Sequence, residues 1–160
     1  MVITKSKSIM AVEQALLDAG LSLDVRVLAA STRTAADAAT AIGCHVGQIV
    51  KSLLFQSVEA GKPVLVLASG SNRVDEAKVS NRVGDKIIKA DAEFTRECTG
   101  FAIGGVAPVG HPLKIHFVFI DEDLLHYDQL WAAAGTPHAV FSLAPADLVK
   151  LTNGKITAVK

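Results

Sequence analysis

The chain has 160 residues, half of them hydrophobic and one fifth charged, and its acidic and basic side chains balance to a net charge of zero. This length suits a single domain over residues 1–160, and the neutral charge argues against a protein that binds nucleic acid over a broad basic surface, although a local basic pocket is compatible with it. No apolar run approaches the roughly 20 residues of a membrane span and no signal-type segment follows Lys5 and Lys7, so we expect a cytosolic protein that binds no membrane.

Two helices are predicted near the N-terminus. The apolar residues of segment 8–20 recur near helical spacing and stop at Gly20, a residue typical of helix C-caps. Hydroxyl residues then precede an alanine-rich helix over residues 35–42, which Gly43 would end. Thr34 is a candidate N-cap of that helix, and with Arg33 it is also a candidate for binding substrate.

A β-hairpin is predicted next. The apolar runs 51–55 and 64–68 are separated by a Gly-Pro turn at residues 60–63. Side chains alternate between the two faces of a strand, so Lys51 shares a face with Leu53 and Phe55 and lays its aliphatic stem on the apolar side.

The rest of the chain alternates irregularly between helix and strand. Helices are expected over 73–83, 91–98 and 144–151, and one within 121–135 with Leu124, Leu125, Leu130 and Trp131 near one side; strands are expected over 86–90, 115–120, 139–142 and 155–159. Hairpins beside crossover helices favour a mixed α/β fold, with a mixed sheet surrounded by helices. A doubly wound nucleotide-binding fold is disfavoured, because no Gly-rich turn follows the first strand.

The glycine-rich segment 104–111 is the most informative stretch. It can be a tight turn, but three glycines around Pro108 also suit a loop whose main-chain amides stabilise a developing oxyanion. A Cβ at Gly105 would then crowd the substrate, so Gly105→Ala is expected to reduce turnover more than stability.

Lys51 is the candidate partner of that loop. It can be an ordinary strand lysine with its stem on apolar surface, or it can hold a phosphate or carboxylate at the mouth of a pocket. Gly70, Ser71 and Asn72 follow a buried strand, so they can line the same pocket or cap the next helix.

The histidines and cysteines show no metal-ligand spacing. There is no HxxxH or CxxC pair, and Cys44 and Cys98 are expected to be small buried residues. His116 is expected in the core, whereas His111 and His138 follow Gly-Pro turns and are candidates for binding substrate. We expect no metal and no cofactor.

Four segments resemble the YbaK/ProX aminoacyl-tRNA deacylases, stand-alone relatives of the editing domain of bacterial prolyl-tRNA synthetase. They are AATAIGCHVGQIVKSLLF at 38–55, GSNRVDEAKV at 70–79, TGFAIGGVAPVGH at 99–111 and AAAGTPHAVFSLAPADLVKLT at 132–152. They occur in the family's order, and the resemblance spans residues 34–159.

This resemblance implies a distorted mixed β-barrel or sheet with helices around it. It implies that Lys51 contacts the phosphate of the terminal adenosine of tRNA, that Gly104, Gly105 and Ala107 face the aminoacyl ester, and that Pro108 shapes the loop. No metal or protein nucleophile is implied. The cysteine-specific branch often has a hydroxyl residue before the loop proline; Ala107 therefore favours the branches that clear other small amino acids.

The expected function is hydrolysis of the ester of a small, wrongly attached amino acid at the 3′ acceptor end of tRNA, with a synthetase as a possible further partner. The alternatives are a non-catalytic module that binds a synthetase or the acceptor end, and a hydrolase of another small acyl ester or of a phosphate-bearing ligand. The oligomeric state stays open.

Overall fold

The computed structural model describes residues 6–22, 24–29 and 34–160. One eight-stranded mixed sheet connects its strands in the order β1-β7-β6-β2-β3-β5-β8, with β4 paired to β2 outside this path. The strands are β1 (Val25–Val27), β2 (Ile49–Ser57), β3 (Pro63–Ser69), β4 (Ile87–Lys89), β5 (Phe117–Asp121), β6 (Leu130–Ala133), β7 (Ala139–Leu143) and β8 (Lys155–Thr157). The predicted mixed sheet is confirmed.

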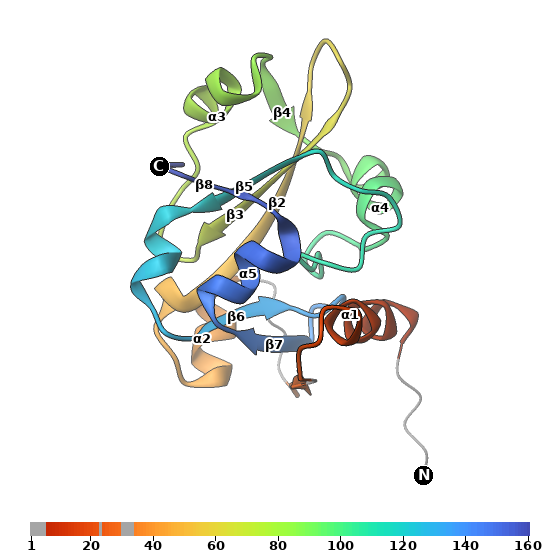
Figure 1. Ribbon diagram of the computed structural model, residues 1–160, viewed down its shortest axis with the longest axis vertical. Coiled ribbons are helices and arrows are strands. Elements are labelled where there is room, and N and C mark those ends of the chain that lie inside the picture. The colour runs from red at the N-terminus through yellow and green to blue at the C-terminus, as the bar shows by residue number, and fades with distance from the viewer. Residues whose placement is uncertain (1–5, 23, 30–33) are drawn as a thin grey trace.

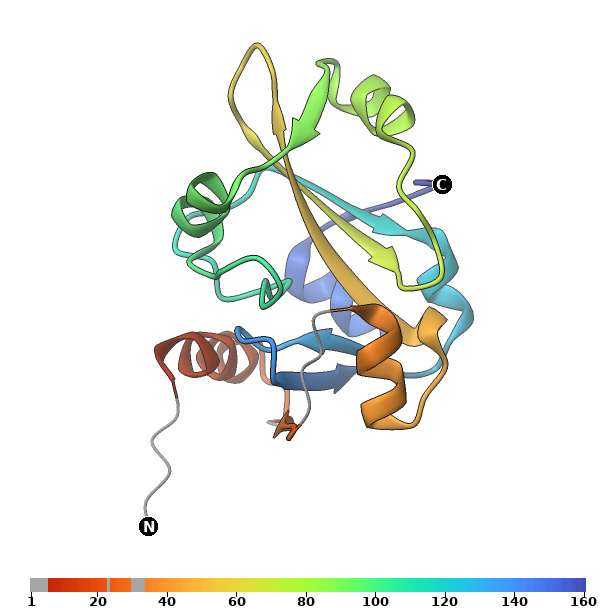
Figure 2. The same ribbon diagram turned by 180° about the vertical axis from the view of Figure 1, so that it is seen from behind.

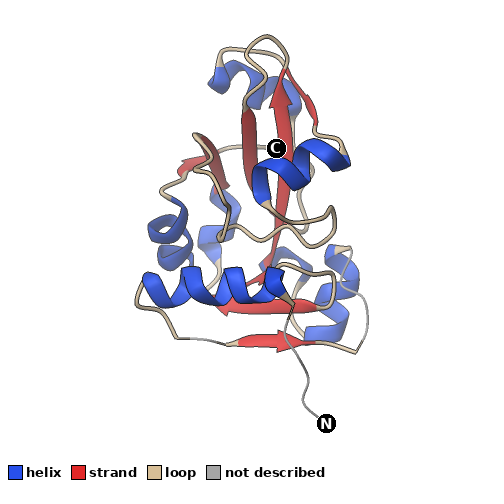
Figure 3. Cartoon of the chain, turned by 90° about the vertical axis from the view of Figure 1, so that its right-hand side faces the viewer, coloured by secondary structure: helices blue, strands red, loops and turns tan. Residues whose placement is uncertain are grey.

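Helices lie on both sides of this sheet. They are α1 (Lys7–Asp18), α2 (Ala35–Ile42), α3 (Glu76–Val83), α4 (Ala92–Thr99) and α5 (Pro145–Thr152), with short 3₁₀ turns η1 (Val46–Gln48) and η2 (Glu122–His126). In Figure 1, α5 lies in front of the strands, and in Figure 2, seen from behind, α2 does. Figure 3 shows α1 running alongside the strands at the lower end of the molecule. No helix in the described part of the chain is long and apolar enough to cross a membrane.

The predicted helix ends are confirmed at several positions. Thr34 caps α2, its Oγ1 accepting a hydrogen bond of 3.1 Å from the Asp37 amide, and Gly43 ends that helix at a φ of 85°. Asp91 caps α4 through a 2.8 Å bond from the Phe94 amide. Short polar side chains accept hydrogen bonds from the free amides at the start of a helix, and helix starts can therefore be predicted from the sequence.

The helix predicted within residues 121–135 is wrong. Only the single turn η2 forms, after which Tyr127 is extended at a φ of −108° and a ψ of 151° and the chain enters β6. Leu130 and Trp131 are buried because β6 lies between β2 and β7. A short apolar run buried on both faces has no period by which helix and strand can be distinguished.

Three residues expected in the core are not fully buried. His116 is exposed, because it lies in a bend and β5 begins only at Phe117, whose ring it meets edge-on with centroids 5.3 Å apart. Cys44 and Cys98 are only partly buried, and this burial raises the pKa of both thiols.

Strand β2 is the part of the fold that positions the candidate site. One edge pairs with β3 over residues 50–56. The opposite edge has two partners: β6 pairs in parallel with Ile49 and Val50, and β4 pairs antiparallel with residues 55–57. On this second edge, residues 51–54 have no partner strand among the described residues.

Candidate active site

A cavity of about 730 Å³ lies against this free part of β2. Its wall contains residues 49–55 of β2, the start of α2, the segment joining β4 to α4, part of the glycine-rich loop, and residues 131–133 of β6. Figure 2 looks at this side of the molecule, with β2 between α2 and α4. The cavity therefore gathers segments from across the chain around Lys51.

Lys51 is half-buried in the cavity wall and is oriented by the main chain. Its ammonium donates a hydrogen bond to the carbonyl of Asn72. Burial lowers the pKa of Lys51, and the negative charge of Asp121 opposes part of this shift. A desolvated ammonium with one hydrogen bond to a carbonyl keeps two further N–H groups for an anion.

A buried carboxylate holds the turn that carries Asn72. Asp121 is 1% exposed and accepts hydrogen bonds from the Ser69 amide at 3.0 Å and from the Asn72 side-chain amide at 2.8 Å. The same amide of Asn72 donates to Asp123 at 2.7 Å. The Asn72 side chain is therefore engaged by protein carboxylates, while its carbonyl holds Lys51.

The other residues of the predicted 70–72 segment have different positions. Gly70 lines the cavity, and a Cβ there would lie 2.3 Å from the Val46 carbonyl oxygen, so this close approach requires glycine. Ser71 is exposed, with its Oγ 3.2 Å from that of Ser69. The alternative that this segment caps the next helix is wrong, since Asp75 caps α3.

Of the three loop residues predicted to face the ester, one lines the cavity. Gly104 lines the cavity at a φ of 94°, and its amide makes no hydrogen bond within the described residues. The Gly105 amide instead donates to the Ala102 carbonyl at 3.0 Å. Ala107 and Pro108 are buried and do not line the cavity.

The reason for glycine at position 105 differs from the sequence-based expectation. A Cβ there would lie 2.8 Å from the Cα of Thr136 and 3.0 Å from the Gly135 carbonyl oxygen. It would thus meet another loop, not the cavity. Gly105 allows two loops to pack closely, and stability should suffer on substitution.

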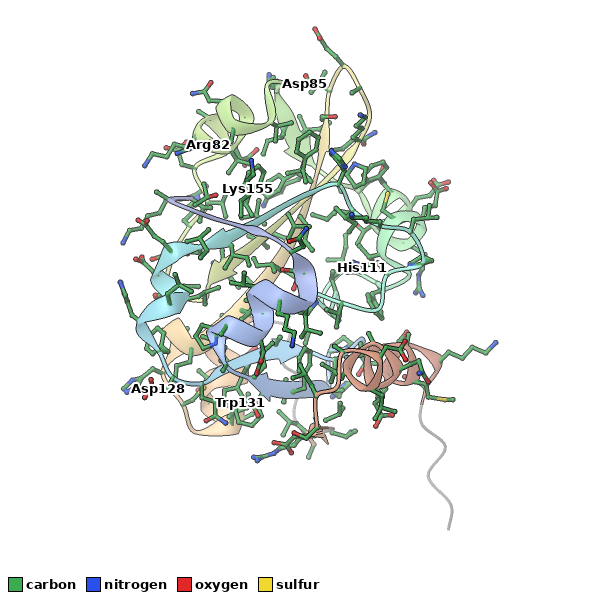
Figure 4. The ribbon with its side chains drawn as sticks, in the orientation of Figure 1. Arg82, Asp85, His111, Asp128, Trp131 and Lys155 are labelled. Atoms are coloured by element: carbon green, nitrogen blue, oxygen red, sulfur yellow. The ribbon has the colours of Figure 1, made fainter. Side chains whose placement is uncertain are left out.

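The two candidate histidines lie outside the cavity wall. His111 is in the segment between α4 and β5 (Figure 4), where its Nε2 lies 2.8 Å from the Ala107 carbonyl oxygen, and burial lowers its pKa. It borders a second hollow of about 440 Å³ together with Pro108. His138 is exposed. Of the two N-terminal candidates, Thr34 lines the cavity, and Arg33 lies outside the described residues.

The sequence did not single out several residues of the wall. Arg73 and Lys89 are exposed, line the cavity beside Glu76, and form no ion pair within the described residues. Trp131, which Figure 4 shows on β6, also lines it. No three His, Cys, Asp or Glu side chains of the described residues form a group that could hold a metal ion. The cavity thus combines a mostly apolar lining with the charged side chains of Lys51, Arg73, Glu76 and Lys89, a combination that is common in pockets for small ligands.

Residues 29–151 match the family model of the aminoacyl-tRNA editing domain. The chain belongs to this family. A crystal structure described as "a putative trans-editing enzyme for prolyl tRNA synthetase" is 47% identical, with a TM-score of 0.91 and coverage of 98% of this chain and 99% of that one. The predicted family and the mixed α/β fold are confirmed.

Two curated relatives extend the comparison. The Enterococcus faecalis protein named "Putative Cys-tRNA(Pro)/Cys-tRNA(Cys) deacylase EbsC" is 28% identical over 131 residues, covering 79% of this chain and 76% of that protein. The proline–tRNA ligase of Maridesulfovibrio salexigens is 39% identical over 85 residues, which are 52% of this chain and 14% of the ligase. The editing domain therefore has relatives both as a separate protein and within a synthetase.

Proposed function

We propose that this protein hydrolyses the ester linking a small, wrongly attached amino acid to the 3′ end of tRNA. One observation carries the proposal: Lys51 and Gly104, whose amide makes no hydrogen bond within the described residues, both line one cavity of about 730 Å³. Membership of the editing family supports the reaction class. This volume is within the range of cavities that enclose small ligands, and it suits a terminal aminoacyl-adenosine.

The charges of the cavity suit the phosphate of that terminal nucleotide. Lys51 offers a compact cation with N–H groups that can donate to a phosphate. Arg73 and Lys89, which are exposed and line the cavity, add positive charge. A neutral protein can bind an RNA end in this way, because only a few phosphates need to be neutralised. The acceptor end is therefore the part of tRNA that we expect to enter.

The reaction needs donors for the developing oxyanion. Water adds to the ester carbonyl, the bond from the carbonyl carbon to the ribose oxygen breaks, and the ribose oxygen takes up a proton from the added water and leaves as a hydroxyl. The Gly104 amide would stabilise the negative oxygen, an effect that is typically worth about 100-fold or more per donor. Because Gly105 and Ala107 do not present amides to the cavity in this structure, Gly104 is the loop donor that we propose.

Selection of the amino acid should depend on the cavity wall. Ala107 is 0% exposed, so the residue before the loop proline does not itself contact the cavity. Ile103 and Val106 of the same loop line it. We propose that these bulky side chains limit the cavity to small amino acids.

The direct test is deacylation of tRNAs charged with Ala, Ser, Thr, Cys and α-aminobutyrate. We expect turnover of at least one, lost in Lys51→Ala and kept in Lys62→Ala, which removes an exposed lysine outside the cavity. Absence of turnover for every ester by the folded protein would refute the proposal.

A binding module without catalytic activity is the second candidate. The observation in its favour is that a matching segment of a proline–tRNA ligase forms part of a larger synthetase. In that case Lys51→Ala would lose binding to tRNA or synthetase with no turnover to lose. Hydrolysis of tRNA-free acyl esters in the same assay would instead identify a general esterase.

A further inference from the structure

The main-chain groups of Ser52 lie on the free edge of β2, and Ser52 lines the cavity. Hydrogen bonds from Gly70 N to Ile49 O (2.8 Å) and from Ser57 N to Lys62 O (2.9 Å) show that odd-numbered residues of β2 face β3. The Ala90 amide donates to the Leu54 carbonyl at 3.1 Å, so even-numbered residues face the opposite edge. Main-chain direction alternates along a strand, and Ser52 therefore faces the same way as Leu54.

Ser52 has no partner on that edge. The ladder to β6 ends at Val50, and the last hydrogen bond on the side of β4 is to Leu54. The ladders to β6 and β4 do not include Ser52, no hydrogen bond outside the ladders of the described residues involves its amide or carbonyl, and its Oγ is a buried hydroxyl without a partner. Ser52 itself lines the cavity. Most polar groups inside proteins are paired, so three unpaired groups on one residue indicate a ligand.

The size of this gap limits what can bind there. Val50 and Leu54 are the even-numbered neighbours of Ser52; Val50 pairs with β6, and the Leu54 carbonyl accepts from Ala90, while the Leu54 amide makes no hydrogen bond among the described residues. Among the described residues, the free main-chain groups of this edge are the amide and carbonyl of Ser52 and the amide of Leu54. An extended peptide would need several free residues along the edge, whereas a single amino acid can pair with the amide and carbonyl of one residue.

An aminoacyl ester carries the complementary groups. In an antiparallel pair, two opposed residues exchange two N–H···O bonds. The α-ammonium and the carbonyl of an esterified amino acid are the donor and acceptor of such a residue. Both the donor and the acceptor of Ser52 can therefore be satisfied at once.

We propose that the aminoacyl group binds the free edge of β2 as a one-residue strand, with its α-ammonium donating to the Ser52 carbonyl and its ester carbonyl accepting from the Ser52 amide. This inference rests on the substrate class of the proposed function. These two hydrogen bonds involve only the α-amino group and the carbonyl of the aminoacyl group. Selection among amino acid side chains therefore depends on the surrounding cavity wall. The Ser52 amide would also add a second donor to that of Gly104.

The test uses a ligand that cannot be hydrolysed. The probe is 3′-deoxy-3′-(alanylamino)adenosine, compared with its propionyl analogue, which lacks the amino group, and with free alanine. We expect the propionyl analogue to bind about 10-fold or more weakly, the cost of a lost charged hydrogen bond. On binding the alanyl probe, the Ser52 amide should be protected from hydrogen exchange. Free alanine as tight as the probe would make the site a free amino acid site.

A chemical variant isolates the main-chain donor. Replacing Ser52 by its α-hydroxy acid through semisynthesis removes the N–H and keeps the side chain. Because this N–H has no partner in the unliganded chain, thermal stability should be retained while the alanyl probe binds about 10-fold more weakly. Equal binding of the alanyl and propionyl probes, or an unprotected Ser52 amide, would overturn the inference.

These outcomes separate the two proposals. If the protein hydrolyses mischarged tRNA but binds the alanyl and propionyl probes equally, the one-residue strand is refuted and the proposed function is retained. Binding of the alanyl probe through Ser52 without hydrolysis of any tRNA would do the reverse.

Discussion

Lys51 donates a hydrogen bond from its ammonium to the main-chain carbonyl of Asn72. Asn72 is in turn fixed through its side chain by Asp121 and Asp123, which lie at the end of β5 and in η2. The position of the cation in the cavity therefore depends on a carboxylate buried beneath the neighbouring turn. Asp121 is a positioning residue for Lys51.

Asp121→Asn should change both stability and the protonation of Lys51. Loss of a buried carboxylate that accepts three hydrogen bonds should cost about 1–3 kcal/mol of unfolding free energy. The charge of Asp121 favours the protonated ammonium, so its removal lowers the pKa of Lys51 further. Activity that needs charged Lys51 should then decline at lower pH than in the wild type.

The measurement is the alkaline limb of kcat/KM, with the Lys51 side chain followed by NMR. Asp123→Asn is the matched control, since Asp123 also bonds Asn72 but does not contribute to the pKa shift of Lys51. An alkaline limb that stays in place in Asp121→Asn would show a structural role alone. Arg73, Glu76 and Lys89 line the same cavity and are unchanged in both variants.

The exposed cations of the cavity should act through tRNA phosphates. Arg73→Ala and Lys89→Ala should raise KM and leave kcat nearly unchanged, because both side chains are exposed. Each lost phosphate contact should reduce the slope of log binding constant against log salt by about 0.7–0.9. The comparison is with Lys62→Ala across a series of salt concentrations; identical slopes in all three variants would contradict a role in phosphate binding.

Local features of the fold could be predicted because each depends on a few adjacent residues. Thr34 before an alanine run and Gly43 after it define α2, and the Gly-Pro turn defines the β2–β3 hairpin. Leu130 and Trp131 were misassigned because their strand is set by β2 and β7, which are distant in sequence. The three-residue β1 escaped prediction because it is too short to show a period.

The candidate site was predictable in part for the same reason. Lys51 stands out in the sequence as a charged residue within an apolar run, and Gly104 as part of a glycine-rich loop. Both line the cavity. The support from Asp121 crosses 49 residues to Asn72, and no local pattern signals it. The position of Asp121 at the end of a buried strand was the one sequence feature that could have indicated this role. The free edge at Ser52 exists only because β2 changes partner.

Gly105→Ala tests the packing of the glycine-rich loop. The added Cβ would approach the Thr136 Cα to 2.8 Å, and backbone on both sides must move. We expect a loss of about 1–3 kcal/mol in unfolding free energy, typical of overpacking, together with reduced turnover as Gly104 shifts. Urea unfolding and kcat measured on the same sample decide it; full stability with lost turnover would restore the view that this residue faces the ester.

Thr34 combines a structural role with a place in the cavity wall. Thr34→Ala should cost about 0.5–2 kcal/mol, because the cap of α2 is lost. Thr34→Ser and Thr34→Asp keep a capping oxygen and should restore stability, but only the serine keeps a neutral hydroxyl at the cavity. Turnover that follows stability in all three variants would make Thr34 a cap alone.

His111 should make stability depend on pH. Burial lowers its pKa from 6.5, whereas the unfolded chain keeps the ordinary value, so the unfolded state binds a proton first as the pH falls. The unfolding free energy should therefore decrease as the pH falls below about 6.5, until the folded imidazole also becomes protonated. His111→Gln keeps a side-chain N–H donor for the Ala107 carbonyl and should weaken this dependence, while His138→Gln, at an exposed position, should not. Urea denaturation between pH 5 and 8 measures it, and equal slopes in the two variants would show that His111 is not the titrating group.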